Sequence, residues 1–175
     1  MVAQVLDRDE AVANWTAFVD AYRASMPAVY RYLYRATGGD VELAEDLTQA
    51  TFMTAVSAFK DDLPDCLSIQ WLQVVARSRL IDHYRRRARE ETKLSLIVGR
   101  RPDVPVAGDL SIPEAQAALG DLSASQRAAL VLRYLDDLPV AEVAAWLGRS
   151  VRATESLLVR ARASFRAAYE ERRDG

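Results

Sequence analysis

The sequence predicts an all-α protein made of two small helical domains joined by a flexible linker. Apolar residues recur at three- and four-residue steps along most of the 175 residues, and no segment alternates as a half-buried strand does. Half of the residues are apolar and 27% are charged, which is typical of a globular protein. Residues 91–113 contain three prolines and two glycines and are therefore interpreted as the linker. We expect the first domain over residues 10–90 and the second over residues 114–170.

The first helix is predicted over residues 15–34, where aromatic and aliphatic side chains fall on one face. Gly38 and Gly39 interrupt this pattern, because glycine commonly follows the end of a helix. Asp40 is expected to cap the next helix, which covers residues 41–58 and carries one stripe of small and apolar residues.

A loop containing Pro64 is expected over residues 60–68, and a third helix from Ile69 to about Arg89. Trp71 is interpreted as a core residue, with a base-stacking platform as the alternative. His83 is interpreted as an exposed helix residue.

The second domain contains stronger local signals. Ser123 followed by Gln126 predicts a capping box at the start of a helix. Pro139 suits a first helical position, Gly148 suits a helix end, and Ser150 can cap the following helix. A short helix, a glycine turn and a second, arginine-rich helix predict a helix-turn-helix that binds DNA, with a plain αα-hairpin as the alternative.

Charge is distributed in blocks that the net charge of −2 conceals. Residues 36–70 carry a net charge of −6 and residues 71–101 a net charge of +6. Residues 102–142 carry −5, and residues 143–173 carry +4. The two basic blocks are candidates for phosphate-binding surfaces, and the acidic blocks for faces that meet a basic partner. Chance segregation of charge along helices is the alternative.

The sequence does not predict a catalytic or metal site. Cys66 is the single cysteine and His83 the single histidine, so neither a disulfide framework nor a multi-cysteine metal site is expected. No acid pair is matched with a histidine or with a glycine-rich phosphate loop, so we expect neither an enzyme nor a bound cofactor. The first residues lack an apolar signal region, so we expect a cytoplasmic protein.

Three motifs together resemble the bacterial sigma factors of the extracytoplasmic-function (ECF) type. They are AEDLTQATF at 44–52, WLQVVARSRLIDHYRRRAR at 71–89, and LRYLDDLPVAEVAAWLG followed by SLLVRARASFR within 132–166. The resemblance runs from about Trp15 to Tyr169. It implies a region 2 that binds the β′ clamp helices of core RNA polymerase and opens the −10 element. It also implies a region 4 that reads the −35 element and touches the β flap.

The resemblance assigns candidate residues to three surfaces. The residues expected to bind core polymerase are Asp46, Leu47, Gln49 and Phe52. Those expected to bind the −10 DNA are Lys60, Arg77, Ser78, Arg85, Arg86, Arg87 and Arg89. Those expected to bind the −35 DNA are Arg149, Ser150, Arg152, Glu155, Ser156, Val159, Arg160 and Arg162. We expect Phe52 to be exposed as an apolar anchor, with burial in the domain core as the alternative.

Two residues depart from the pattern of many relatives. Ser78 stands where an asparagine is common, and Glu155 lies in a segment that often reads GTVKSRL. Glu155 can accept a hydrogen bond from a cytosine amino group, so the −35 sequence cannot be taken from better-known relatives.

The expected partners are core RNA polymerase and promoter DNA, and the resemblance also admits an anti-sigma factor. A stand-alone helix-turn-helix regulator is the main alternative function, but it leaves the motifs at 44–52 and 71–89 unexplained. A pure interaction protein, such as an anti-sigma antagonist, has no use for two basic surfaces.

Overall fold

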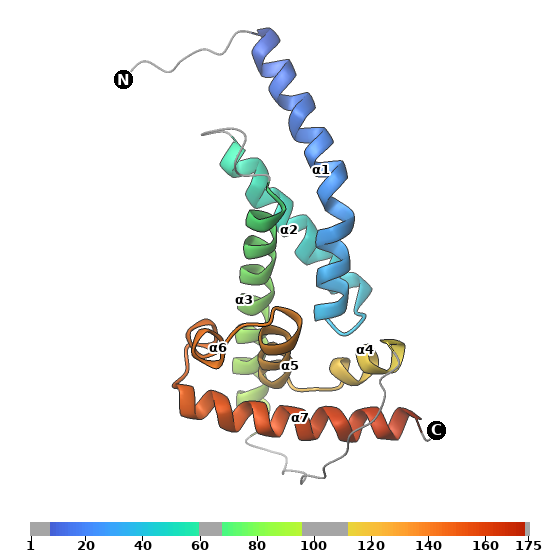
Figure 1. Cartoon of the computed structure of the whole chain (residues 1–175), viewed down its shortest axis with the longest axis vertical. Helices are drawn as coiled ribbons and strands as arrows, with labels where there is room; N and C mark the ends of the chain where they lie inside the picture. The colour runs from blue at the N-terminus through green and yellow to red at the C-terminus, as the bar shows by residue number, and fades with distance from the viewer. Residues whose placement is uncertain (1–7, 60–67, 96–111, 174–175) are drawn as a thin grey trace.

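The computed structural model describes residues 8–59, 68–95 and 112–173, and all regular structure in these ranges is helical. The elements are α1 (Arg8–Ala36), α2 (Val41–Phe59), α3 (Ile69–Ser95), α4 (Ile112–Gly120), α5 (Ala124–Leu130), the π-helical turn η2 (Val131–Leu135), α6 (Val140–Leu147) and α7 (Val151–Arg173). Helices α1 to α3 form the first unit, and α4 to α7 form the second (Figure 1). The predicted all-α, two-domain fold is confirmed.

The junction between α1 and α2 has the predicted chemistry. Gly38 and Gly39 have φ values of 76° and 86°, which most side chains resist. Asp40 then caps α2, because its Oδ1 accepts a hydrogen bond of 3.0 Å from the backbone N–H of Leu43. The chain thereby reverses tightly, and α2 packs against α1.

Helix α3 is longer than predicted. It continues to Ser95, so the first five residues of the predicted linker are helical. Glu91 lies in this extension, and its carboxylate accepts hydrogen bonds of 3.1 and 3.2 Å from the backbone N–H of Ala124 at the start of α5. Residues 96–111 of the predicted linker lie outside the described residues.

The second unit has a small core of its own. Ser123 and Gln126 form the predicted capping box at the start of α5. The buried side chains between α5 and α7 are those of Leu122, Ala129, Leu130, Leu157, Leu158 and Ala161. Helix α7 therefore lies across the base of the molecule, below α5 and α6 (Figure 1).

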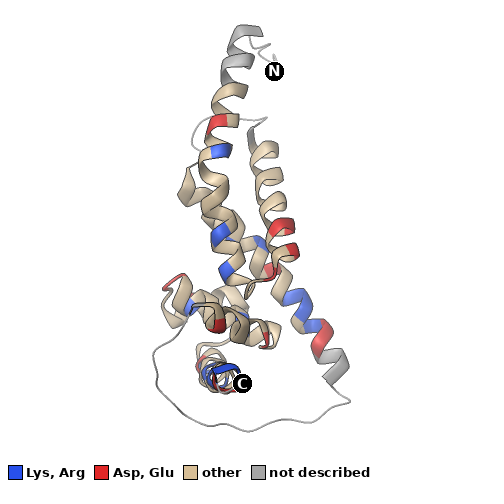
Figure 2. Ribbon diagram, turned by 90° about the vertical axis from the view of Figure 1, so that its right-hand side faces the viewer, with Lys and Arg blue, Asp and Glu red and all other residues tan. Residues whose placement is uncertain are grey.

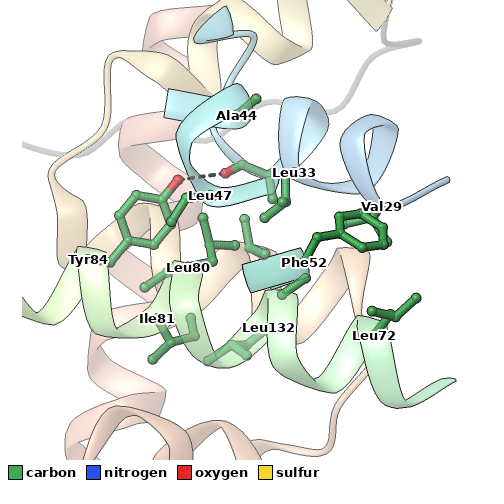
Figure 3. Close-up of a cluster of buried hydrophobic side chains, with 14 of the residues drawn as sticks. Val29, Leu33, Ala44, Leu47, Phe52, Leu72, Leu80, Ile81, Tyr84 and Leu132 are labelled. Atoms are coloured by element: carbon green, nitrogen blue, oxygen red, sulfur yellow. Dashed lines mark hydrogen bonds between the residues drawn. The ribbon is translucent and has the colours of Figure 1, made fainter. Parts of the chain in front are cut away.

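The two units pack against each other, which the sequence did not predict. One continuous cluster of buried side chains contains Leu33 of α1 and Leu80 of α3, and also Leu132 of η2 and Val143 of α6. Figure 3 shows Leu132 beside Ile81 of α3. The first unit thus buries part of its apolar surface under the second.

Tyr84 of α3 lies at this junction. Its hydroxyl donates a hydrogen bond of 2.6 Å to the carbonyl oxygen of Ala36, drawn as the dashed line in Figure 3. Burial raises the pKa of Tyr84 to about 12. From the second unit, the Arg127 guanidinium lies 5.7 Å from the centre of the Tyr84 ring and also donates to the carbonyl oxygen of Thr37.

Candidate polymerase and nucleic-acid interfaces

The expectation that Phe52 is exposed is wrong. Its side chain is only 5% exposed and packs edge-on against Tyr22 of α1, with ring centres 4.6 Å apart. Leu47 is also buried, so neither residue forms the outer face of α2. The periodicity explains this, because Phe52 follows buried Thr48 by four residues and precedes buried Ala55 by three.

The outer face of α2 carries a different set of side chains. Asp46 and Gln49 are exposed as expected, and Met53, which the sequence analysis missed, follows them at helical spacing with 59% exposure. Methionine adapts its shape at binding surfaces. The exposed face of α2 therefore offers an acid, an amide and a flexible apolar side chain. Its position three and seven residues after Gln49 and Asp46 was the signal for Met53.

The C-terminal half of α3 concentrates positive charge. Arg85, Arg86, Arg87 and Arg89 are all exposed, where their charge also complements the negative end of the helix dipole. A hollow of about 460 Å³ lies between α2 and α3, and arginine side chains line much of it. The lining residues are Leu47, Ala50, Arg79, Asp82, His83, Arg85, Arg86 and Arg89. Figure 2 shows this basic end of α3 on the same side of the molecule as the acids of α2.

Arg79 joins this cluster, although the sequence analysis gave it no role. Its Nη2 donates a hydrogen bond of 2.8 Å to the hydroxyl of Thr54 on α2. The guanidinium is thereby held between α2 and α3. Its position six residues before Arg85 did not by itself predict that contact.

Arg77 does not belong to the exposed cluster. Its Nε donates a hydrogen bond of 2.9 Å to Oδ2 of Asp136, which lies just after η2 in the second unit. Ser78 is half-buried beside it. Lys60, the remaining residue expected at the −10 DNA, lies outside the described residues.

The helix-turn-helix has the predicted turn. Gly148 ends α6 with φ 63° and ψ 40°, and Ser150 Oγ accepts a hydrogen bond of 3.2 Å from the backbone N–H of Ala153 as the cap of α7. Pro139 is the N-cap residue of α6 rather than its first helical residue. Such one-residue shifts are ordinary at helix ends.

The first turns of α7 separate an inner face from an outer face. Thr154, Leu157, Leu158 and Ala161 are buried against the rest of the second unit. The outer residues, all exposed, are Arg152, Glu155, Ser156, Val159 and Arg160. Their common face can be presented to a groove without disturbing the core of the unit.

Two further arginines lie at the margins of this face. Arg149 Nη2 donates to the hydroxyl of Ser125, 3.3 Å away. Arg162 Nη1 lies 3.4 Å from the hydroxyl of Tyr134, an exposed side chain of η2. Both arginines are exposed, so their guanidinium groups extend the basic border of the helix-turn-helix.

A second hollow, of about 300 Å³, lies where α2, α3 and α5 meet. Its lining mixes acids such as Asp40 and Asp46 with Arg87 and Arg127, so no single charge dominates. His83 also lines it, and burial, reinforced by nearby arginines, lowers the pKa of this imidazole. Among the described residues, no group of acids, histidines or cysteines is arranged to hold a metal ion.

In the described part of the chain, no helix combines the length and the apolar character that crossing a membrane requires.

The chain is similar to known bacterial transcription factors along most of its length. The family described as Sigma-70 region 2 matches residues 21–90, and Sigma-70, region 4 matches residues 113–165. The probable RNA polymerase sigma-C factor of Mycobacterium bovis is 33% identical over 159 residues, which cover 87% of this chain and 83% of that protein. The ECF RNA polymerase sigma factor SigM of Bacillus subtilis is 33% identical over 155 residues, which cover 86% of this chain and 93% of that protein.

The fold is also found in a solved structure. The sigma factor RpoE from Bartonella quintana, solved in complex with the anti-sigma factor NepR, superposes with a TM-score of 0.52 at 24% identity. The match covers 87% of this chain and 96% of that chain. A stand-alone helix-turn-helix regulator is excluded, because region 2 and region 4 occur here in one chain and in order. The chain belongs to the sigma-70 family, in its ECF group, and is an alternative sigma factor that directs RNA polymerase to specific promoters.

Proposed function

We propose that the three surfaces described above divide the work of promoter recognition. Region 2, over residues 10–90, binds core polymerase through α2 and the −10 DNA through α3. Region 4, over residues 114–170, binds the −35 DNA through α7. The observation that carries the proposal is the outer face of α7, where five neighbouring side chains are exposed on a helix whose opposite side is buried.

For polymerase binding, we propose Asp46, Gln49 and Met53 as the contact residues. Their exposure supports this choice, and the burial of Leu47 and Phe52 removes both from it. Truncation of an interface anchor typically costs on the order of 2 kcal/mol of binding free energy. Met53→Ala is therefore expected to weaken binding to core polymerase while leaving the unfolding transition close to that of the wild type.

For the −10 DNA, we propose that the exposed arginines of α3 hold phosphates of the separated strand. The proposed residues are Arg79, Arg85, Arg86, Arg87 and Arg89. Phosphate contacts carry no base code, so replacing several of them with alanine should reduce open-complex yield at every promoter and flatten its dependence on salt. Run-off transcription with purified core polymerase on genomic fragments measures this. A variant that changes promoter preference but keeps the salt dependence would contradict the assignment.

For the −35 DNA, we propose that Arg152, Glu155, Ser156, Val159 and Arg160 face the major groove. Ser150 caps the helix, and Arg149 and Arg162 neutralise phosphates at its border. Glu155 is suited to accept from a cytosine amino group, and Val159 to meet a thymine methyl.

Glu155→Lys is expected to shift the preferred base at one or two −35 positions, because a specific contact contributes roughly 1–3 kcal/mol of discrimination. The measurement is transcription of a randomised −35 library by wild-type and variant holoenzymes. Glu171→Lys is the matched control, since it makes the same charge change on the same helix about 24 Å further along. Identical profiles for wild type and Glu155→Lys would remove Glu155 from the reading face.

We further propose that the chain is not itself an enzyme and works in the cytoplasm on the active site of RNA polymerase. An anti-sigma factor is a candidate partner, because the similar RpoE was solved with NepR. Co-purification of the chain with core polymerase, or with an antagonist that releases it, tests these assignments together.

A further inference from the structure

The second unit docks on the side of α3 that carries the arginines, and one ion pair fixes this contact. Asp136 accepts hydrogen bonds from Arg77 Nε at 2.9 Å and from the hydroxyl of Tyr32 at 3.2 Å. The side chain of Asp136 is 4% exposed and that of Arg77 is 20% exposed. Three helices, α1, α3 and the end of η2, therefore meet at a single carboxylate.

Burial changes the protonation behaviour of this group. Burial raises the pKa of Asp136, and the hydrogen bond and charge of Arg77 offset part of that rise. Burial acts to lower the pKa of Arg77, but the hydrogen bond and charge of Asp136 outweigh it and raise that pKa. Burial, reinforced by the negative charge of Asp136, also raises the pKa of Tyr32. The carboxylate and guanidinium thus depend on each other for compensation.

The local backbone is shaped to present Asp136. The helix that begins as α5 widens into the π-helical turn η2, and the backbone N–H of Asp136 bonds back to the carbonyl of Val131. Asp137 follows with φ 51°, a conformation that costs energy in a residue other than glycine. Turns of this kind often mark functional positions.

A second arginine of α3 is engaged by the same unit. Arg85 Nη2 donates a hydrogen bond to the carbonyl oxygen of Trp146, near the end of α6. A side-chain carbon built on Gly148, in the turn of the helix-turn-helix, would lie 3.5 Å from the same nitrogen. The Arg77 guanidinium lies 5.9 Å from the centre of the Trp146 ring. The surfaces proposed for −10 and −35 DNA therefore adjoin.

This arrangement is too short to serve both promoter elements. Their names place them about 25 base pairs apart, which is about 85 Å of straight duplex at ~3.4 Å per base pair. Helices α3 and α7 have 27 and 23 residues and would span only about 75 Å if laid end to end. Instead, α3 meets the helix-turn-helix at Arg85. The docked units must separate before both elements can be read.

We propose that the docked arrangement is an autoinhibited state of the free chain, in which Asp136 occupies Arg77 in place of a DNA phosphate. This inference rests on the proposed −10 role of α3. The Trp146 carbonyl occupies Arg85 in the same way, so docking removes two cations from the DNA-binding surface. Release of the second unit returns both cations to DNA and frees region 4 to move to the −35 element.

The test uses neighbouring aspartates that differ only in docking. Asp136→Asn removes the buried charge, whereas Asp137→Asn removes the charge of an exposed side chain that pairs only weakly with Arg133, 3.5 Å away. Distances between the units are measured with fluorophores at Arg31→Cys and Glu171→Cys, both exposed, in a Cys66→Ser background. Binding of a labelled single-stranded DNA of mixed sequence to the full chain is measured by anisotropy without polymerase.

Asp136→Asn is expected to lengthen the distance between the fluorophores and to tighten DNA binding at least about tenfold, because only the open fraction of the wild type binds. Asp137→Asn is expected to match the wild type within about twofold. If Asp136→Asn leaves both distance and affinity unchanged, or lengthens the distance without tightening DNA binding, the inference is overturned.

A second pair of variants opens the units without touching the ion pair. A Cβ at Gly38 would lie 2.6 Å from the backbone nitrogen of Gly120 in α4, so Gly38→Ala forces the units apart. Gly39→Ala carries a similar penalty for its positive φ, but its Cβ meets only the Tyr34 ring at 3.6 Å or more. Gly38→Ala should therefore behave as Asp136→Asn does, and Gly39→Ala as the wild type. Equal DNA affinities for the two glycine variants would also overturn the inference.

Failure of the proposed function gives a different result. If holoenzymes carrying alanine at the exposed arginines of α3 open promoters normally, the −10 assignment is wrong whatever the free chain does. The autoinhibition test depends on the free chain alone, so the two outcomes are separable.

Discussion

Replacement of Phe52 distinguishes a core residue from an interface residue most sharply. Phe52 is about 95% buried and makes an edge-on contact with Tyr22. Truncation of a buried phenylalanine to alanine typically costs about 3–5 kcal/mol, of which about 0.5–1.5 kcal/mol reflects an aromatic pair of this kind. For a chain of this length, 1 kcal/mol shifts Tm by about 2–4 °C. Phe52→Ala should therefore lower Tm by roughly 6–20 °C.

The assay is urea and thermal unfolding followed by circular dichroism, with Met53→Ala as the matched control. The control removes the neighbouring apolar side chain, which is 59% exposed, and should change the free energy of unfolding by less than about 1 kcal/mol. Binding to core polymerase is measured below both transitions, where Phe52→Ala should bind nearly as well as the wild type and Met53→Ala should not. A Phe52→Ala variant with unchanged stability and weakened binding would refute the assignment of Phe52 to the core.

Two further predictions follow from buried groups of α3. Because the folded-state pKa of His83 is lowered, its contribution to stability is present above the unfolded pKa of about 6.5 and is lost as pH falls through the folded pKa; His83→Gln should remove this loss, measured as the difference in urea unfolding between pH 7.5 and pH 5. Tyr84→Phe leaves the carbonyl of Ala36 without its 2.6 Å donor and should cost about 1–3 kcal/mol of unfolding free energy, with no change expected for Tyr134→Phe, whose ring is exposed.

The features that could be predicted from the sequence are local ones. The caps at Asp40, Ser123 and Ser150 and the left-handed turn at Gly148 each depend on residues within four positions of one another. The same holds for the two faces of α7, because helical spacing alone separates Leu157 and Leu158 from the outer residues.

The error at Phe52 has a different origin. Periodicity places Phe52 on the buried stripe with Thr48 and Ala55, but the resemblance to the family suggested an exposed anchor. The helical spacing was the better guide, because burial follows the face on which a side chain lies. The same spacing assigns the exposed position to Met53.

The packing of the two units could not be predicted from local patterns. It depends on Asp136 and Arg77, which lie 59 positions apart, and on the close approach of Gly38 to Gly120. Neither pair has a signature in its own segment. The linker between the units leaves their relative position open until these contacts are known.

The blocks of opposite charge acquire a physical meaning from this packing. Residues 71–101 carry a net charge of +6 and residues 102–142 a net charge of −5, and the contact between Arg77 and Asp136 joins the two blocks. Opening the units breaks a buried ion pair, which is costly when the freed charges find no partner. Promoter DNA supplies a phosphate to the same guanidinium, so the number of compensated cations on α3 is conserved. Free chain and DNA-bound chain are therefore closer in energy than either is to an open chain without DNA, and this difference couples opening of the sigma factor to the presence of the promoter.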